Sequence, residues 1–128
     1  MGKICILITM IFLHILDDFC MQPIGFLADG KQKEWWKKNA PEEMYRFDYL
    51  VVMFFHCFSW AFMIMLPLFV YCFIFGGMCY PLLFISNIVI HFVVDNMKAN
   101  KRKINLVQDQ LAHILQIIIT WALWFYIY

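Results

Sequence analysis

The chain is poor in charged residues, which make up 15% of its 128 positions and are clustered instead of dispersed. Hydrophobic residues account for 64% of the sequence, and the mean hydropathy is +0.72; both lie above the values of an average soluble domain. This composition excludes an ordinary soluble fold and indicates an integral membrane protein. The formal net charge is only +1, so the placement of the charges is more informative than their sum.

Paired cysteines are also missing. The five cysteines contain no CxxC pair, and all of them fall in or at the ends of apolar segments. This spacing excludes a metal site built from closely spaced cysteine thiolates and does not indicate a disulfide framework. We interpret these residues as small, polarisable packing residues. They are Cys5, Cys20, Cys57, Cys72 and Cys79.

Four long apolar runs are present instead, each long enough to cross a bilayer at about 1.5 Å per residue. They predict an all-α integral membrane four-helix bundle that forms a single transmembrane domain over residues 1–128. The polar stretch 23–45 has tryptophans among lysines, which is typical of a loop or short helix lying on the membrane surface. Pro67 is expected to kink or end the second helix. The predicted helices are 3–22, 46–75, 79–99 and 105–127.

Basic residues are concentrated between the spans. Nine of the ten Lys and Arg residues lie in 23–47 or 98–103, and only Lys3 lies elsewhere. By the positive-inside rule, the loops 23–45 and 98–104 are expected to be cytoplasmic, and both termini are expected to face outward.

Histidine and aspartate recur four residues apart near the apolar runs, a spacing that places both side chains on one face of a helix. Charged groups inside a bilayer are costly, and they are usually paired and functional. Three such pairs and one further histidine are all predicted to lie in the cytoplasmic leaflet. They are His14 and Asp18 in the first helix, His56 in the second, His91 and Asp95 in the third, and Asp109 and His113 in the fourth.

Carboxylates and imidazoles that converge inside a four-helix bundle form many known metal sites. This donor set suits zinc, which we favour, or manganese and iron, better than magnesium or calcium. We therefore predict that the seven residues bind one or two divalent ions, with His56 acting as a ligand or as the catalytic general base. Hydrogen bonds to the second nitrogen of each imidazole are expected from nearby polar side chains. The candidates are Gln22, Ser59, Asn87 and Gln116.

Other interpretations of the same residues stay open. The cluster is also compatible with a proton relay or with polar side chains that only join the helices. Haem is a weaker alternative, because haem ligation does not call for an aspartate four residues from each histidine. Asp17 is either a ligand or a helix-end charge, and Asp18 is preferred because it aligns with His14.

The polar residues form a series of short motifs: His14-x3-Asp18-Phe19-x2-Gln22, the lone His56, His91-Phe92-x2-Asp95-x2-Lys98 and Asp109-Gln110-x2-His113. Their order and spacing resemble the DUF3307 family, a group of small, uncharacterised membrane proteins of bacteria and their phages. The resemblance covers nearly the whole chain, although each motif alone is short. It implies a location in a bacterial inner membrane and supports these residues as the functional set, but it names no activity.

The predicted function is a metal-dependent hydrolase that acts at the cytoplasmic face on a phosphate- or ester-containing substrate. The pattern is broadly similar to that of membrane-bound metal-dependent hydrolases. The alternatives are a metal-ion or proton channel or transporter, and a non-catalytic membrane factor with a structural metal site. Nothing in the sequence directly indicates nucleic-acid binding. Lysines of the two loops are expected to attract an anionic small molecule or lipid head group. They are Lys31, Lys33, Lys98 and Lys101.

Overall fold

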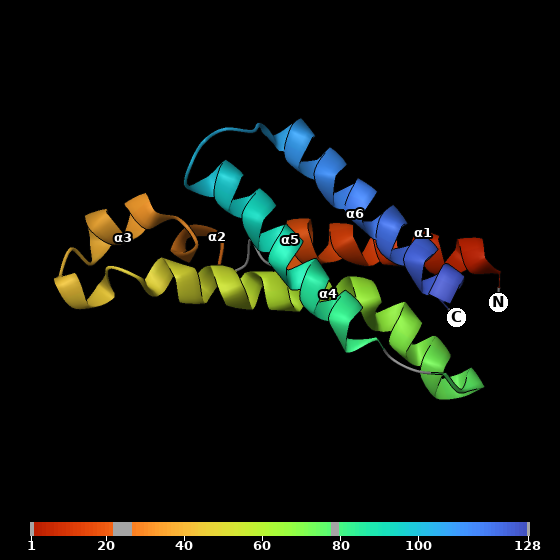
Figure 1. Cartoon of the computed structure of the whole chain (residues 1–128). Coiled ribbons are helices and arrows are strands. Elements are labelled where there is room, and N and C mark those ends of the chain that lie inside the picture. Colours follow the sequence, from red (N-terminus) through yellow and green to blue (C-terminus); the bar gives the residue numbers. More distant parts are fainter. Residues whose placement is uncertain (1, 22–26, 78–79, 128) are drawn as a thin grey trace.

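The computed structural model describes residues 2–21, 27–77 and 80–127, and every regular element in this part of the chain is a helix. The predicted all-α fold is therefore confirmed. Four of the described helices are long and apolar enough to cross a membrane. Two short helices lie between the first and second of them in the chain (Figure 1).

The elements differ in detail from the predicted ranges. They are α1 (Lys3–Ile15), the π-helix η1 (Leu16–Met21), α2 (Leu27–Gly30), α3 (Lys33–Asn39), the 3-10 helix η2 (Glu43–Tyr45), α4 (Asp48–Phe75), α5 (Pro81–Ala99) and α6 (Leu106–Ile127). Both α4 and α6 begin slightly later than predicted, and the predicted loop contains α2 and α3. Gln22 and Cys79, at predicted helix ends, lie outside the described residues.

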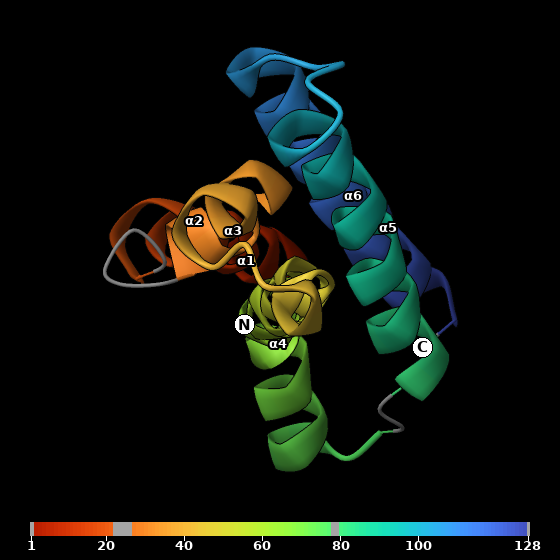
Figure 2. The ribbon, with the colours of Figure 1, turned by 90° about the vertical axis from the view of Figure 1, so that its left-hand side faces the viewer.

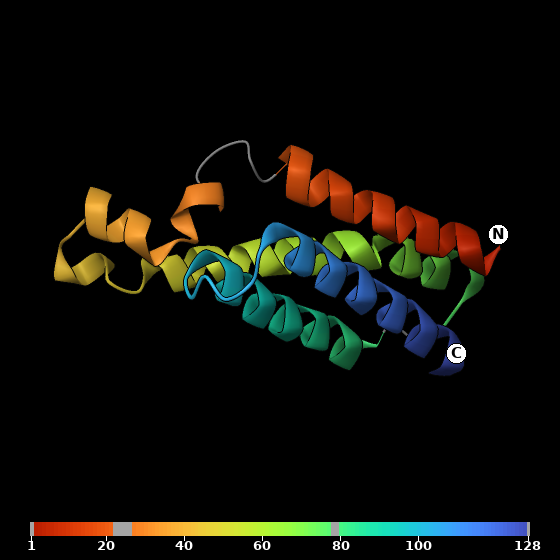
Figure 3. The ribbon, with the colours of Figure 1, turned by 90° about the horizontal axis from the view of Figure 1, so that it is seen from above.

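The four long helices form a ring of neighbours. α4 packs against α1 and α5, and α6 completes the ring by packing against α5 and α1. Figure 2 shows the ring as two pairs, α1 with α4 and α5 with α6. Both chain termini lie at one end of the bundle, whereas the α2–α3 segment and the α5–α6 link lie at the other end (Figure 3).

α4 is the longest helix and continues through Pro67 to Phe75. Because proline lacks an N–H and crowds the preceding turn, it bends a helix that does not end there. α4 changes direction in its second half (Figure 1). The helix ends at Gly76, and the φ angles of Gly76 and Gly77 (76° and 142°) lie in the region that favours glycine. Pro81 then occupies the first turn of α5.

The first span changes its winding at Leu16, where α1 passes into the π-helix η1. A π-helix closes its hydrogen bonds over one more residue than an α-helix does. Within η1 the consecutive residues Asp17 and Asp18 are both turned inward: Asp17 is fully buried and Asp18 is partly buried. The first span, predicted as one continuous α-helix, is therefore α-helical only up to Ile15.

The interior of the bundle has an apolar zone and a polar zone. Toward the termini most buried side chains are apolar, and toward the α2–α3 end the buried histidines and aspartates gather. Three further buried polar residues, Asn87, Gln116 and Thr120, lie outside the histidine cluster. The outer surfaces of the long helices are apolar, as expected for helices in contact with lipid. The apolar zone consists of Ile6, Met10, Trp60, Ala61, Ile64, Met65, Leu68, Cys72, Ile117 and Trp124.

Candidate metal centre

His91 of α5 lies fully buried at the centre of the polar zone. Its Nε2 atom lies 3.1 Å from Nε2 of His56 on α4. Its Nδ1 atom lies 3.1 Å from Nδ1 of His113 on α6. The indole of Trp60 stacks on the His91 ring, with the two ring centroids 4.1 Å apart. Three helices therefore bring three imidazoles together at one point.

Asp95 follows His91 by one helical turn and is also buried. One carboxylate oxygen, Oδ2, lies 2.6 Å from Nε2 of His56, and the other, Oδ1, lies 3.2 Å from Nε2 of His113. The ammonium group of Lys31 donates to Oδ2 at 2.8 Å. The carboxylate is thus enclosed by polar partners in an interior of low dielectric, where such contacts are strengthened.

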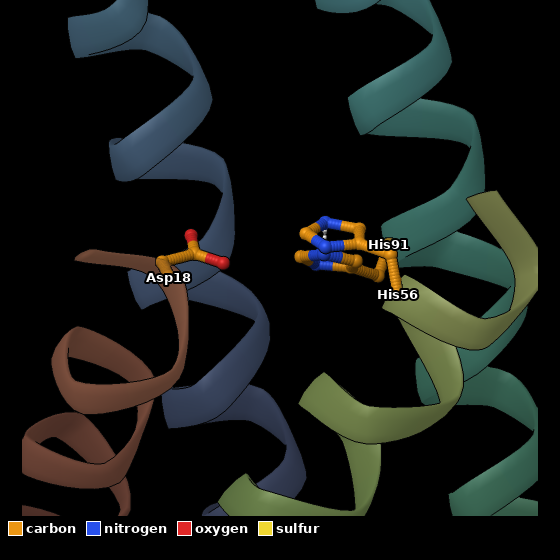
Figure 4. Close-up of side chains that lie close together, drawn as sticks. All are labelled: Asp18, His56 and His91. Carbon is orange, nitrogen blue, oxygen red and sulfur yellow. Dashed lines mark hydrogen bonds between the residues drawn. The ribbon is translucent and has the colours of Figure 1, made fainter. Parts of the chain in front are cut away.

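Asp18 approaches this group from η1. Figure 4 shows its carboxylate pointing toward the paired rings of His56 and His91. Two sets of potential ligand atoms each lie within 4.8 Å of one another, and His91 belongs to both. One set adds Asp18 and His56, and the other adds Asp95 and His113. Since two ligand atoms of one zinc ion lie at most about 4 Å apart, a small inward movement suffices to close either set on an ion.

Three buried atoms of the polar zone have no hydrogen-bond partner among the described residues. They are Oδ1 of Asp18, Nδ1 of His56 and Oδ1 of Asp109. A buried polar atom without a partner costs roughly 1–3 kcal/mol, so such atoms commonly indicate a bound water or ion. Two of the three are carboxylate oxygens, which are acceptors suited to a cation. The donor set therefore fits a divalent metal.

His14, also predicted as a ligand, has hydrogen-bond partners at both ring nitrogens. The indole N–H of Trp60 can only donate, and it donates to Nδ1 of His14 at 2.8 Å. Nε2 of a neutral His14 therefore carries the proton and donates to Oε1 of Gln110 at 3.1 Å. His14 lies beside the two ligand sets, and its role as a ligand stays a prediction.

Asp109 lies on the same side of the cluster as His14. Its Oδ2 atom accepts a hydrogen bond from Nζ of Lys98 at 2.5 Å, and its Oδ1 atom lies 3.4 Å from Nε2 of His113. The side-chain amide of Gln110 donates to Asp109 at 3.2 Å and to Asp18 at 3.4 Å. Gln110 thus connects two acidic residues that come from different helices.

The side chains expected to bond the second imidazole nitrogens have other partners. Ser59 donates to Asp17 at 3.0 Å. Oδ1 of Asn87 accepts from Gln116 at 2.8 Å and from Thr120 at 3.0 Å, which forms a separate polar group. The physical reason is depth, since Asn87 lies one turn farther from the α2–α3 end than His91 does. Gln22, the remaining candidate, lies outside the described residues.

Trp60 is a site residue that the sequence did not indicate. Gln110 was indicated only as part of the Asp109-Gln110-x2-His113 motif, and Asp17 only as either a ligand or a helix-end charge. Trp60 follows His56 by four residues, and Gln110 precedes His113 by three, so helical spacing alone placed both on the correct faces. Asp17 follows His14 by three residues, so the same spacing also indicated its inward face.

Two of the four predicted anion-attracting lysines lie at the cluster. Lys31 contacts Asp95, and Lys98 contacts Asp109, whereas Lys33 and Lys101 are exposed. A cavity of about 130 Å³ adjoins the cluster and has room for a few water molecules. Its polar lining consists of Asp18, Lys31, Asp95, Lys98 and Gln110.

Replacing Trp60 by phenylalanine is expected to lower the free energy of unfolding by about 1–3 kcal/mol, because Nδ1 of His14 then loses its buried donor. The matched control is Trp121→Phe, since the Trp121 indole donates to the carbonyl of Lys3 at an exposed position. That variant should change stability by less than about 0.5 kcal/mol. Denaturant unfolding in detergent measures both, and equal effects would contradict a special role for Trp60.

The chain was compared with protein families, curated proteins and solved structures. The sequence model of the family described as "Protein of unknown function (DUF3307)" matches residues 6–127. No curated protein and no solved structure matches the chain. The match covers nearly the whole chain and includes every motif on which the resemblance was based. The chain therefore belongs to the DUF3307 family.

Proposed function

We propose that the protein is a membrane-embedded metal-binding protein that hydrolyses a phosphate- or ester-containing substrate. The proposal depends mainly on one observation: imidazole and carboxylate groups from three long helices and η1 converge within metal-binding distance. The loop charges favour placing this end of the bundle at the cytoplasmic face. Zinc is the preferred ion for such a mixed nitrogen and oxygen donor set, and manganese or iron is the next choice.

Separate roles follow for the clustered residues. His91, Asp95 and His113 form a fully buried set and are the best candidates to hold the ion, with Asp18 opposite them. A bound divalent ion would supply an activated water and polarise a phosphoryl or ester oxygen. His56 is the candidate general base, because Asp95 lies 2.6 Å from its Nε2 atom and orients the ring.

The apolar zone makes hydrolysis a better proposal than transport. Toward the termini the interior contains mostly buried apolar side chains, among them Met10, Ile64 and Trp124, which offer a transported ion few polar contacts. A polar cavity, in contrast, lies beside the cluster. This arrangement suits a reaction site entered from one side of the membrane.

The test begins with protein purified in detergent without any chelator. We expect one or two equivalents of a divalent metal by elemental analysis. We also expect metal-dependent hydrolysis of a chromogenic phosphate or carboxylic ester.

His56→Gln should retain the metal but lose about 100-fold or more in turnover, as expected for loss of a general base. Ser86→Ala, at a site remote from the cluster, is the control. Protein without stoichiometric metal would refute the proposal, and metal without turnover would leave only a structural site.

A further inference from the structure

Lys31 occupies an unusual position for a loop lysine. It follows α2, yet its ammonium group reaches into the bundle and lies 2.8 Å from Oδ2 of Asp95 and 3.2 Å from Nε2 of His56. Only 20% of its side chain is exposed. A single positive charge is thus placed between a carboxylate oxygen and an imidazole nitrogen that both belong to the candidate metal centre.

The carboxylate of Asp95 is also what a metal ion would contact. Its Oδ1 atom lies 3.2 Å from Nε2 of His113 and 3.7 Å from Nε2 of His91, the other two residues of the buried ligand set. An ion bound to this carboxylate would lie about 2 Å from its ligand oxygen and therefore close to the ammonium that donates to Oδ2. Two positive charges so close together also repel strongly where the dielectric is low. Lys31 and a divalent ion therefore compete for the negative charge of Asp95.

The backbone around Lys31 is fastened to the end of α5. The side-chain amide of Asn100 donates to the carbonyl of Lys31 at 3.2 Å, and its Oδ1 atom accepts from the backbone N–H of Lys33 at 2.7 Å. The indole of Trp36 donates to the carbonyl of Gly30 at 2.6 Å. The backbone of this segment is therefore held in place, and the flexible part is the long Lys31 side chain.

A polar cavity adjoins the Lys31 side chain and can receive it when it is displaced. Lys31 and Lys98 both line the polar cavity of about 130 Å³ beside the cluster. Once a metal neutralises Asp95, the freed ammonium can turn into this cavity. A positive charge there is suited to an anionic oxygen such as that of a phosphate group.

From these contacts we infer that Lys31 is a tethered counter-ion with two positions. Without a metal, its ammonium group pairs with the carboxylate of Asp95. When the metal binds, Lys31 moves into the cavity and binds the anionic phosphate group of the substrate. This inference rests on the proposed metal-dependent function and assigns the substrate class to phosphate esters in preference to uncharged esters.

The first experiment uses wild-type protein in detergent and an amine-acetylating reagent, with mass spectrometry to measure modification of each lysine. Metal-free Lys31 should react at least about tenfold more slowly than exposed Lys33, because its ion pair must first break. Zinc should raise the Lys31 rate several-fold, and inorganic phosphate added to the zinc-loaded protein should lower it again. An unchanged Lys31 rate with bound zinc would overturn the exchange, and no protection by phosphate would overturn the substrate role.

The second experiment compares zinc affinity in Lys31→Gln and in the matched control Lys33→Gln. Removing the competing charge should tighten zinc binding about tenfold in Lys31→Gln and leave it within about twofold in the control. The thermal stabilisation that zinc confers should increase correspondingly. Equal zinc affinity in wild type and Lys31→Gln would overturn the inference about Lys31 but not the proposed function. If neither protein binds zinc or another divalent ion, the proposed function itself fails.

Discussion

Replacing His91 by alanine is expected to abolish stoichiometric metal binding. His91 is shared by both sets of potential ligand atoms, so its loss leaves neither set complete. Loss of a mere hydrogen-bond partner of a metal ligand costs roughly 10–100-fold in affinity, and the loss of a shared ligand should therefore exceed about 100-fold. Elemental analysis and zinc titration with a competing chelator measure the effect.

The control for this variant is Thr120→Val, another buried polar position in the same bundle. Thr120 donates to Asn87 at 3.0 Å and lies outside both ligand sets, so its loss should leave zinc affinity within about twofold. Because alanine also removes the ring stacked on Trp60, His91→Gln serves as a less disruptive second variant. Full metal occupancy in both His91 variants would show that the centre is not where we place it.

The second large effect is expected from Asp95→Asn, which should lower the free energy of unfolding of the metal-free protein by about 3 kcal/mol. The carboxylate of Asp95 interacts with Lys31, His56 and His113 in a buried setting. Removing one partner of a buried ion pair typically costs about 3–5 kcal/mol. The lower end applies here, because the Lys31 side chain is 20% exposed and can regain contact with water.

Denaturant unfolding in detergent, with chelator present, measures this loss without any contribution from metal. Glu43→Gln is the control, because the Glu43–Arg46 ion pair is exposed and should contribute less than about 0.5 kcal/mol. A change in Asp95→Asn as small as that of the control would contradict the contacts assigned to this carboxylate. The same variant should also bind zinc more weakly, because it replaces a charged ligand oxygen by an amide.

Much of the fold could be predicted from the sequence because hydropathy reports membrane spans directly. A run of about 20 apolar residues has few alternatives to a spanning helix, since every backbone polar group must be satisfied within it. The central part of the site could be predicted from the same cost of burying polar groups in lipid. His91 and Asp95 lie four residues apart in an apolar helix, and their shared face had to turn inward.

The parts that could not be predicted depend on contacts between distant segments. Lys31 stands in a polar stretch without helical periodicity, and its entry into the bundle depends on Asn100 near the other end of the chain. The change from α-helical to π-helical winding at Leu16 is likewise not signalled by the pattern of the six residues of η1. Helical spacing predicted that Ser59 and Asn87 face the interior. It could not predict their hydrogen-bond partners, because these depend on how the helices pack against one another.

Asp17 and Asp18, which are neighbours in the π-helix η1, make different contacts. Asp17 is anchored to Ser59, while Asp18 faces the histidines. Asp17 is fully buried and Asp18 is largely buried, with 12% of its side chain exposed. A carboxylate in the bilayer costs about 2.5–3.5 kcal/mol. Because both acids turn inward, this cost is avoided, and one acid can secure the helix while the other remains available to a ligand.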